Sequence, residues 1–323
     1  MLLKVFNNKN RFLQFLLIAL SFTSVFLLPI KIVTTDGFNP LYDIFISIIG
    51  DNQITLHIVF YFLIVIPIIL TQYFATVFGV LKRNYFHFLF LAPLFIFSNS
   101  NAWSINPTLF ALIFFVIGLS NLFQLNRTEN PIVISSTAFI FSIASLFYSL
   151  FIWNIFLIIA ALFIFREFKI REFLMIIGSF ILPYIYIFTW FFVNDNLLIN
   201  WTEFSNQVFK FSFNISIDNT IVQIGFAILI IGLSIYLLIS IIRTLQNKLI
   251  QLREYILFFI VAFFFSIMLL FIAGTYTSYQ YILIQFLIAF LYSLQLGENK
   301  PKWYHDIVIL LIIAHNIFSV LYA

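Results

Sequence analysis

Acidic side chains gather in one short stretch near the start of the chain, VTTDGFNPLYDIFISIIGDN, which covers residues 33–52. It holds Asp36, Asp43 and Asp51, three of the twelve acids in the whole sequence. A carboxylate can deprotonate an attacking hydroxyl, or it can hold a divalent cation against a sugar phosphate. We therefore expect Asp36 to be catalytic, with Asp43 and Asp51 contacting the substrate. Two alternatives stay open: a solvated loop whose acids keep a helix at the edge of the bundle hydrated, and a ligand site without catalysis.

The residues around Asp43 predict a short helix. Asn39 is a favourable N-cap, Pro40 suits the first helical position, and Gly50 is typical of a helix end. Asp43 and Ser47 lie four residues apart and form a polar stripe, while most other positions are apolar. A helix of about ten residues is too short to cross a bilayer. We therefore expect it to lie in the membrane interface.

A later stretch, residues 194–219, combines acids with a lysine and several aromatic side chains. Asp195, Glu203 and Asp218 supply the carboxylates, and Lys210 is a candidate partner for a phosphate group. Aromatic rings beside carboxylates suit the stacking and hydrogen bonding of sugars. The same composition also suits an aromatic belt at a membrane interface, and both interpretations stay open.

The composition predicts the kind of fold that must position these residues. Hydrophobic residues make up 63% of the chain and charged residues 9%, with a mean hydropathy of +1.11, whereas soluble domains carry about 25% charged residues. Runs of about 20 apolar residues recur, and each can cross a hydrocarbon core of about 30 Å. We predict an all-α fold, one polytopic transmembrane bundle over residues 1–323 with no soluble domain. The sequence has no cysteine, which excludes disulfides and thiolate catalysis.

Eleven apolar runs are predicted to span the membrane. The third is short, and the fifth and sixth share one apolar stretch that needs a tight turn near Ser149 to Asn154. The first is too long for a signal peptide, so we expect a retained helix. No Asp, Glu, Lys or Arg lies well inside these runs, which counts against a proton-driven pump. The predicted spans are 12–33, 54–80, 84–98, 105–125, 132–149, 151–166, 173–194, 220–242, 255–274, 278–295 and 305–322.

The basic residues predict the orientation of the bundle. If the N-terminus lies in the cytoplasm, every lysine and arginine except Lys31 and Lys210 falls on the cytoplasmic side, as the positive-inside rule requires. Residues 33–52 and 194–219 then lie on the outer side. The bases are spread over several loops, so we expect no nucleic-acid partner. Abundant Phe, Ile, Asn and Lys are typical of an AT-rich bacterial genome, which predicts a multi-pass protein of the bacterial inner (cytoplasmic) membrane.

The four histidines divide between the two predicted faces of the membrane. His57 and His315 fall near outer ends of spans, and His87 and His305 near cytoplasmic ends. Pairs separated by much of a core about 30 Å thick cannot hold one metal ion. His57 and His315 could meet on the outer side near Asp36 or Asp51, and His57 is then a candidate substrate contact. The alternative is that each histidine packs at the interface.

Two resemblances add to this interpretation. The stretch SIASLFYSLFIWNIFLIIAALFIFREFKIREFLMIIGSFILPYIY, residues 142–186, resembles an uncharacterised family of bacterial polytopic integral membrane proteins. A weaker resemblance is to the membrane glycosyltransferases of the GT-C class, which use polyprenyl-phosphate-linked sugars. It is carried by the acid after the first span, by INPTLFALIFFVIGLSNLF (105–123) and by the late loop GTYTSYQYILIQFL (274–287).

The second resemblance implies a set of roles. Asp36 would be the base, and Tyr279 and Tyr281 would line the site. That class usually carries an arginine beside a tyrosine in the late loop, whereas this chain has Gln280 before Tyr281, and its first loop lacks the usual paired acid. The cofactor stays unknown, with a divalent cation as one option.

Three functions remain as hypotheses. The first is a GT-C-like glycosyltransferase that takes a sugar from a polyprenyl-phosphate carrier at the outer leaflet. The second is a non-catalytic subunit or scaffold of an envelope assembly, and the third is a lipid or glycolipid flippase or transporter. All three have membrane lipids as partners, and the sequence names no protein partner.

Overall fold

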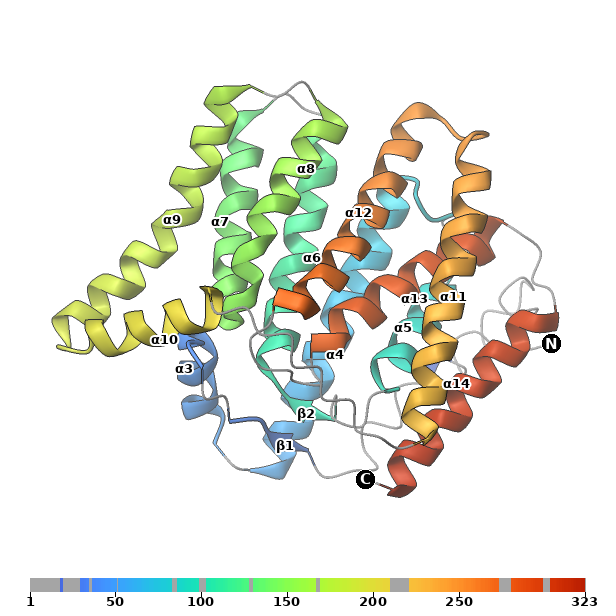
Figure 1. Cartoon of the computed structure of the whole chain (residues 1–323), viewed down its shortest axis with the longest axis horizontal. Coiled ribbons are helices and arrows are strands. Elements are labelled where there is room, and N and C mark those ends of the chain that lie inside the picture. Colours follow the sequence, from blue (N-terminus) through green and yellow to red (C-terminus); the bar gives the residue numbers. More distant parts are fainter. Residues whose placement is uncertain are drawn as a thin grey trace.

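The computed structural model describes residues 18–19, 30–34, 37–50, 52–82, 86–98, 103–127, 130–166, 169–209, 221–272, 280–298 and 303–322. These residues form a helical bundle with two short strands (Figure 1), which confirms the predicted helical fold class. Four predicted site residues, Asp36, Asp51, Lys210 and Tyr279, lie outside the described ranges, as does most of the predicted first span.

Each predicted span after the first corresponds to one helix whose ends lie within a few residues of the prediction. The helices of the described residues are α3 (Pro40–Ile49), α4 (Gln53–Val77), α5 (His87–Ile96), α6 (Pro107–Leu125), α7 (Pro131–Phe147), η3 (Ser149–Asn154), α8 (Ile155–Phe165), α9 (Ile170–Val193), α10 (Leu197–Phe209), α11 (Ile221–Leu245), α12 (Ile250–Ile272), α13 (Tyr281–Glu298) and α14 (Trp303–Tyr322). Three of these helices, α3, η3 and α10, match no predicted span. The strands are β1 (Lys31–Ile32) and β2 (Ser104–Ile105).

Asparagine caps fix where several helices begin. Asn106 Oδ1 accepts a hydrogen bond from the amide of Leu109 at 3.1 Å, and Pro107 follows as the first helical residue of α6. Asn130 does the same at the start of α7, accepting from the amide of Ile132 at 3.0 Å. Both caps satisfy one of the amides that a helix N-terminus leaves without a partner in the helix.

The turn predicted within the long apolar stretch is confirmed. Residues Ser149–Asn154 form the 3-10 helix η3 between α7 and α8. Tyr148 ends α7 in an extended conformation, with its amide bonded to Ala144 O. The chain therefore reverses direction here, and α7 and α8 are separate helices.

Helix length and composition are compatible with a membrane protein. The helices that are long and apolar enough to cross a membrane are α4, α6, α9, α11 (over Gly225–Leu245) and α12. The other apolar helices have shorter stretches in this comparison, including α5, α7, α13 (over Tyr281–Gly297) and α14 (over Trp303–Ile317). Large apolar side chains cover much of the outside, for example Trp190, which is 63% exposed. Such a surface is costly in water and natural in lipid.

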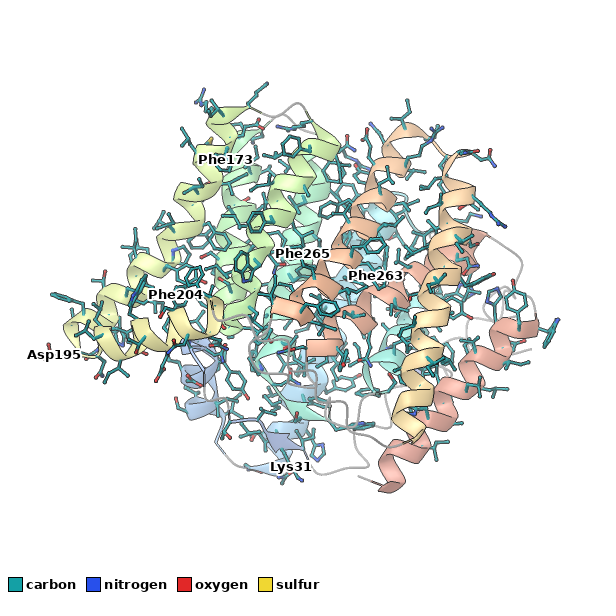
Figure 2. All side chains as sticks on the ribbon, viewed as in Figure 1. Lys31, Phe173, Asp195, Phe204, Phe263 and Phe265 are labelled. Carbon is teal, nitrogen blue, oxygen red and sulfur yellow. The ribbon has the colours of Figure 1, made fainter. Side chains whose placement is uncertain are left out.

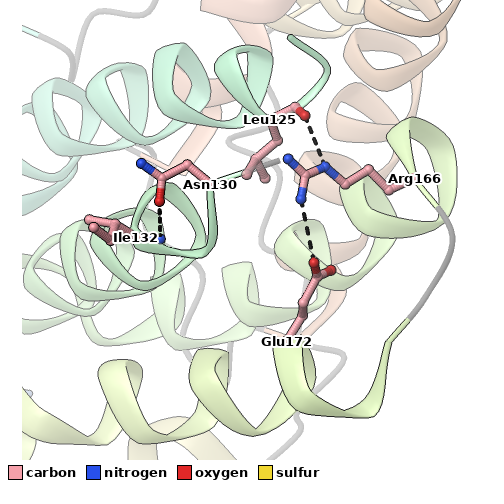
Figure 3. A network of polar contacts seen from close by, with 5 residues as sticks. All are labelled: Leu125, Asn130, Ile132, Arg166 and Glu172. Carbon is pink, nitrogen blue, oxygen red and sulfur yellow. Dashed lines mark hydrogen bonds and ion pairs between the residues drawn. The ribbon is translucent and has the colours of Figure 1, made fainter. Parts of the chain in front are cut away.

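Polar contacts tie several helix ends together at one end of the bundle. Arg127 donates to Val77 O at the end of α4, and Arg166 Nε donates to Leu125 O at the end of α6. Arg166 also forms an ion pair with Glu172 at the start of α9, with a distance of 3.4 Å (Figure 3). We call this the basic end, since Lys82, Arg127, Arg166 and Lys248 lie at helix ends here.

The opposite end carries β1, β2, α3, η3 and α10 (Figure 1), and we call it the α3 end. Aromatic side chains fill the space between the two ends. Phe123 of α6, which is fully buried, meets Phe74 of α4 with ring centroids 5.4 Å apart and Tyr255 of α12 at 4.7 Å. Figure 2 shows the dense side-chain packing around Phe263 and Phe265 of α12. The bundle is therefore held by close ring packing.

Candidate functional site at the α3 end

A two-stranded pairing holds the first loop against the bundle. β1 pairs in parallel with β2, with Lys31 opposite Ser104 and Ile32 opposite Ile105. Tyr42 of α3 closes this arrangement, because its hydroxyl oxygen lies 2.7 Å from Val33 O and 2.9 Å from Ile105 O. Its single proton can be donated to either carbonyl. The fully buried Tyr42 therefore fixes α3 to the strand pair.

The helix predicted around Asp43 is confirmed with its predicted ends. It spans Pro40–Ile49, and Gly50 follows with a left-handed φ of 68°. One detail is wrong: the Asn39 side chain does not cap its own helix. Its Oδ1 instead accepts from the amide of Ser149 in η3 at 3.1 Å. A tertiary partner thus takes the oxygen that the local pattern assigned to the helix N-terminus.

The first half of residues 194–219, a stretch for which the sequence predicted no helix, is helical. Asp195 adopts a left-handed φ of 58° at the tip where α9 turns (Figure 2), and the helix α10 follows. α10 packs on α9 and η3 and buries Phe204 and Val208. Residues 210–219 lie outside the described residues.

The first loop and α10 meet at the α3 end, although more than 150 residues separate them in the chain. A Cβ atom added to Gly37 would lie 2.6 Å from Gln207 Oε1, so a glycine allows this close approach. Phe38 packs edge-on against Phe204, with ring centroids 5.2 Å apart. Gly37, the residue that follows the predicted base Asp36 in the chain, therefore lies against α10.

The same convergence brings two carboxylates near one another. The pKa of Asp43 is raised from 3.8 to about 6, chiefly by burial among neighbouring atoms and also by the negative charge of Glu203 on α10. The Asp43 side chain is still reached by solvent. A carboxyl group that titrates near neutral pH can both accept and donate a proton there. The electrostatic interaction between acids of two separate helices, α3 and α10, is therefore the chemical feature of this site.

Aromatic rings pack together at the same end of the bundle. Phe38 stacks on Phe188 of α9 with centroids 5.7 Å apart, and Phe188 meets Trp201 of α10 at 5.5 Å. Trp201 is half exposed. An exposed ring next to carboxylates fits sugar binding, and it equally fits a residue at the membrane interface. Both interpretations of the later stretch thus stay open.

The structure groups other predicted residues with different helices. Tyr281 begins α13, which packs on α5 and α12, whereas the helix of Asp43 packs on α7. His57 lies in the second turn of α4 and is partly buried. His315 Nε2 lies 2.9 Å from Ser98 O, and its ring stacks on Phe226 with centroids 3.9 Å apart. For His315 the packing interpretation therefore fits.

Glu203 is the residue whose importance the sequence did not reveal. It was visible as one of several acids in residues 194–219, but no spacing rule connects it to an acid some 160 residues earlier. Within the described residues, no three His, Asp or Glu side chains gather in a way that would hold a metal ion. Comparison of the chain with protein-family models, with curated proteins and with solved structures finds no match.

Proposed function

We propose that the chain is a bacterial inner-membrane protein of eleven spans whose N-terminus and basic end lie in the cytoplasm. The helices that follow the first predicted span support this count, and the gathering of Arg127, Arg166 and Lys248 at one end supports the orientation. The α3 end then faces the outer leaflet, with α3 in the membrane interface. The exposed apolar residues Ile44 and Ile48 of α3 would contact lipid.

This topology is tested by cysteine labelling, because the chain contains no cysteine of its own. Ser47→Cys places a thiol on the exposed side of α3, and Asn247→Cys places one in the exposed turn after α11. A membrane-impermeant maleimide applied to cells with a permeabilised outer membrane should label Ser47→Cys alone. Labelling of Asn247→Cys instead would reverse the orientation.

Within that frame, the function that the site supports best is a glycosyltransferase that takes a sugar from a polyprenyl-phosphate carrier. The observation that carries it is the interaction of Asp43 on α3 with Glu203 on α10, with the pKa of Asp43 raised to about 6. Asp36, the proposed base, directly precedes Gly37 beside α10. Such an enzyme needs acids at the interface where a lipid-linked donor presents its sugar.

The proposed reaction has one bond formed and one broken. The acceptor hydroxyl oxygen bonds to the anomeric carbon of the sugar while the bond from that carbon to the phosphate oxygen breaks. Asp36 takes the hydroxyl proton, and the carrier leaves as polyprenyl phosphate. Lys31, exposed on β1 (Figure 2), and Lys210 are the proposed phosphate contacts, and a divalent cation remains a proposed addition.

The test compares lipid-linked sugars and envelope glycans in cells that lack the protein. The native chain should restore the profile, while Asp43→Asn and Glu203→Gln should restore it only in part. Asp195→Asn is the matched control, because asparagine tolerates the left-handed conformation that Asp195 adopts at the same end. Equal restoration by all four chains would leave the acids without a catalytic role.

A second candidate function is a non-catalytic subunit or scaffold of an envelope assembly. It is favoured by the aromatic filling of the described interior around Phe123, which suits a rigid framework. The same filling counts against a flippase, which needs a polar path through the bundle. A scaffold predicts that substitutions at the α3-end acids are tolerated, while changes on lipid-facing helix surfaces, such as that of α9, impair the assembly.

A further inference from the structure

The basic end contains a partly open cavity that the proposed function does not use. It encloses about 290 Å³ and lies between the end of α4, the turn from α11 to α12 and the end of α13. One water molecule takes up about 30 Å³ of liquid, so the cavity has room for a group as large as a phosphodiester. Its wall carries Lys82 and Lys248 together with apolar side chains.

The two lysines reach the cavity because of how the neighbouring helices end. Gly79 has a left-handed φ of 75°, which ends α4 and turns the chain towards Lys82. In the other turn, Arg253 Nε donates to Lys248 O at 2.8 Å and a second guanidinium nitrogen donates to Gln246 O at 3.0 Å. These bonds hold the turn that presents Lys248. Each turn therefore places one lysine in the lining of the same cavity.

The charges interact with one another. The pKa of Lys248 is lowered to about 8, chiefly by burial and also by the positive charge of Lys82. Neighbouring ammonium groups repel, and an anion between them removes that repulsion. The rest of the lining includes the apolar side chains of Leu252, Ile256 and Leu294. A ligand that matches both kinds of lining has an anionic head and an apolar body.

We propose that the cavity lined by Lys82 and Lys248 binds the phosphate group of an anionic phospholipid from the leaflet that meets the basic end. The lysines hold the phosphate, and Leu252, Ile256 and Leu294 contact the glycerol and the first acyl carbons. A free phosphate offers the same head group, but it leaves the apolar wall unused. This site is independent of the acids at the α3 end.

The test measures lipid binding to the purified full chain in detergent by native mass spectrometry, with phosphatidylglycerol as the probe. At the typical contribution of one lysine near an anionic lipid surface, each of Lys82→Gln and Lys248→Gln should weaken binding about fivefold, and the double variant about thirtyfold. Lys169→Gln is the matched control, because Lys169 is exposed at the same end but does not line the cavity. It should bind as the native chain does.

Two further arms identify the source of the phosphate. Leu252→Trp keeps both lysines and fills the apolar side, so it should lower phosphatidylglycerol binding while thermal unfolding confirms that the chain folds. Phosphatidylcholine should bind the native chain and the double variant equally. Native affinity in the double variant would overturn the site. Two results together would overturn the lipid assignment in favour of a soluble anion. Inorganic phosphate at equal concentration would compete with the lipid, and Leu252→Trp would bind phosphatidylglycerol as the native chain does.

Discussion

Asn39 Oδ1 accepts a hydrogen bond from the amide of Ser149, which lies 110 residues later in the chain, at a distance of 3.1 Å. Both residues are buried, with Asn39 1% exposed. The bond joins the start of α3 to η3, the turn between α7 and α8. It therefore links the loop that carries Asp36 and Asp43 to the body of the bundle.

The loss of this bond should destabilise the protein. Asn39→Ala leaves the buried Ser149 amide without its acceptor, which costs about 1–3 kcal/mol. Asn200→Ala is the control, because the Asn200 side chain donates a hydrogen bond to Asn196 O on an exposed surface, where water can replace it. Thermal unfolding in detergent should show a clearly lower melting temperature for Asn39→Ala and little change for the control. If the two variants melt alike, the Asn39 bond does not secure α3.

The raised pKa of Asp43 predicts a dependence of stability on pH. The folded carboxyl binds its proton more tightly than the unfolded one, whose pKa is 3.8. The stabilisation is therefore fully present below that value and is lost as the pH rises through about 6. Asp43→Asn removes the titrating group, so it should raise the melting temperature at neutral pH and leave it nearly unchanged at about pH 4.

A companion variant separates the two causes of this shift. Glu203→Gln removes the neighbouring charge but leaves the burial, which is the larger cause. In the Glu203→Gln chain, the pH above which Asp43→Asn raises the melting temperature should therefore be lower than in the native chain, but still above 3.8. If this pH is the same in both chains, the two acids do not interact.

A glycine in α6 permits close packing of α6 on α7. A Cβ atom at Gly118 would lie 2.9 Å from the ring of Phe141, which is fully buried. Gly118→Ala should therefore cost about 1–3 kcal/mol through overpacking, and Phe141→Leu in the same chain should recover part of the loss. Thermal unfolding in detergent measures both.

Gly178→Ala is the matched control for this change. Gly178 lies in α9 with open space where the Cβ would be, so alanine should stabilise that helix by about 0.5–1 kcal/mol. Opposite signs for the two glycines would confirm that the α6–α7 contact, and not helix propensity, decides the effect at Gly118. The same sign at both positions contradicts that explanation.

Local pattern was enough to predict most helices because each begins or ends at a strong signal. Long apolar runs mark the helices, Asn-Pro pairs start α3 and α6, and the turn at Ser149–Asn154 follows from the length of the apolar stretch. α10 was missed because its residues, LLINWTEFSNQVF, mix polar and apolar types in a way that also suits a loop.

The site depended on contacts that no local pattern contains. The proximity of Asp43 and Glu203 arises from the packing of Phe38 on Phe204 and from the close approach of Gly37 to Gln207. Each contact joins segments more than 150 residues apart. Asn39 likewise follows the N-cap rule in sequence, yet its side chain bonds to Ser149. Tertiary structure thus overrode a correct local signal.

The most direct test of the proposed enzyme concerns Asp36. Cells lacking the protein should be restored with the native chain, with Asp36→Asn or with Asp195→Asn, each at equal abundance in the membrane, and their polyprenyl-phosphate-linked sugars quantified. The proposal predicts that Asp36→Asn leaves the donor accumulated and the envelope glycan missing, while Asp195→Asn restores both. Full restoration by Asp36→Asn, or no change in any glycan when the protein is absent, would contradict a glycosyltransferase and favour the scaffold.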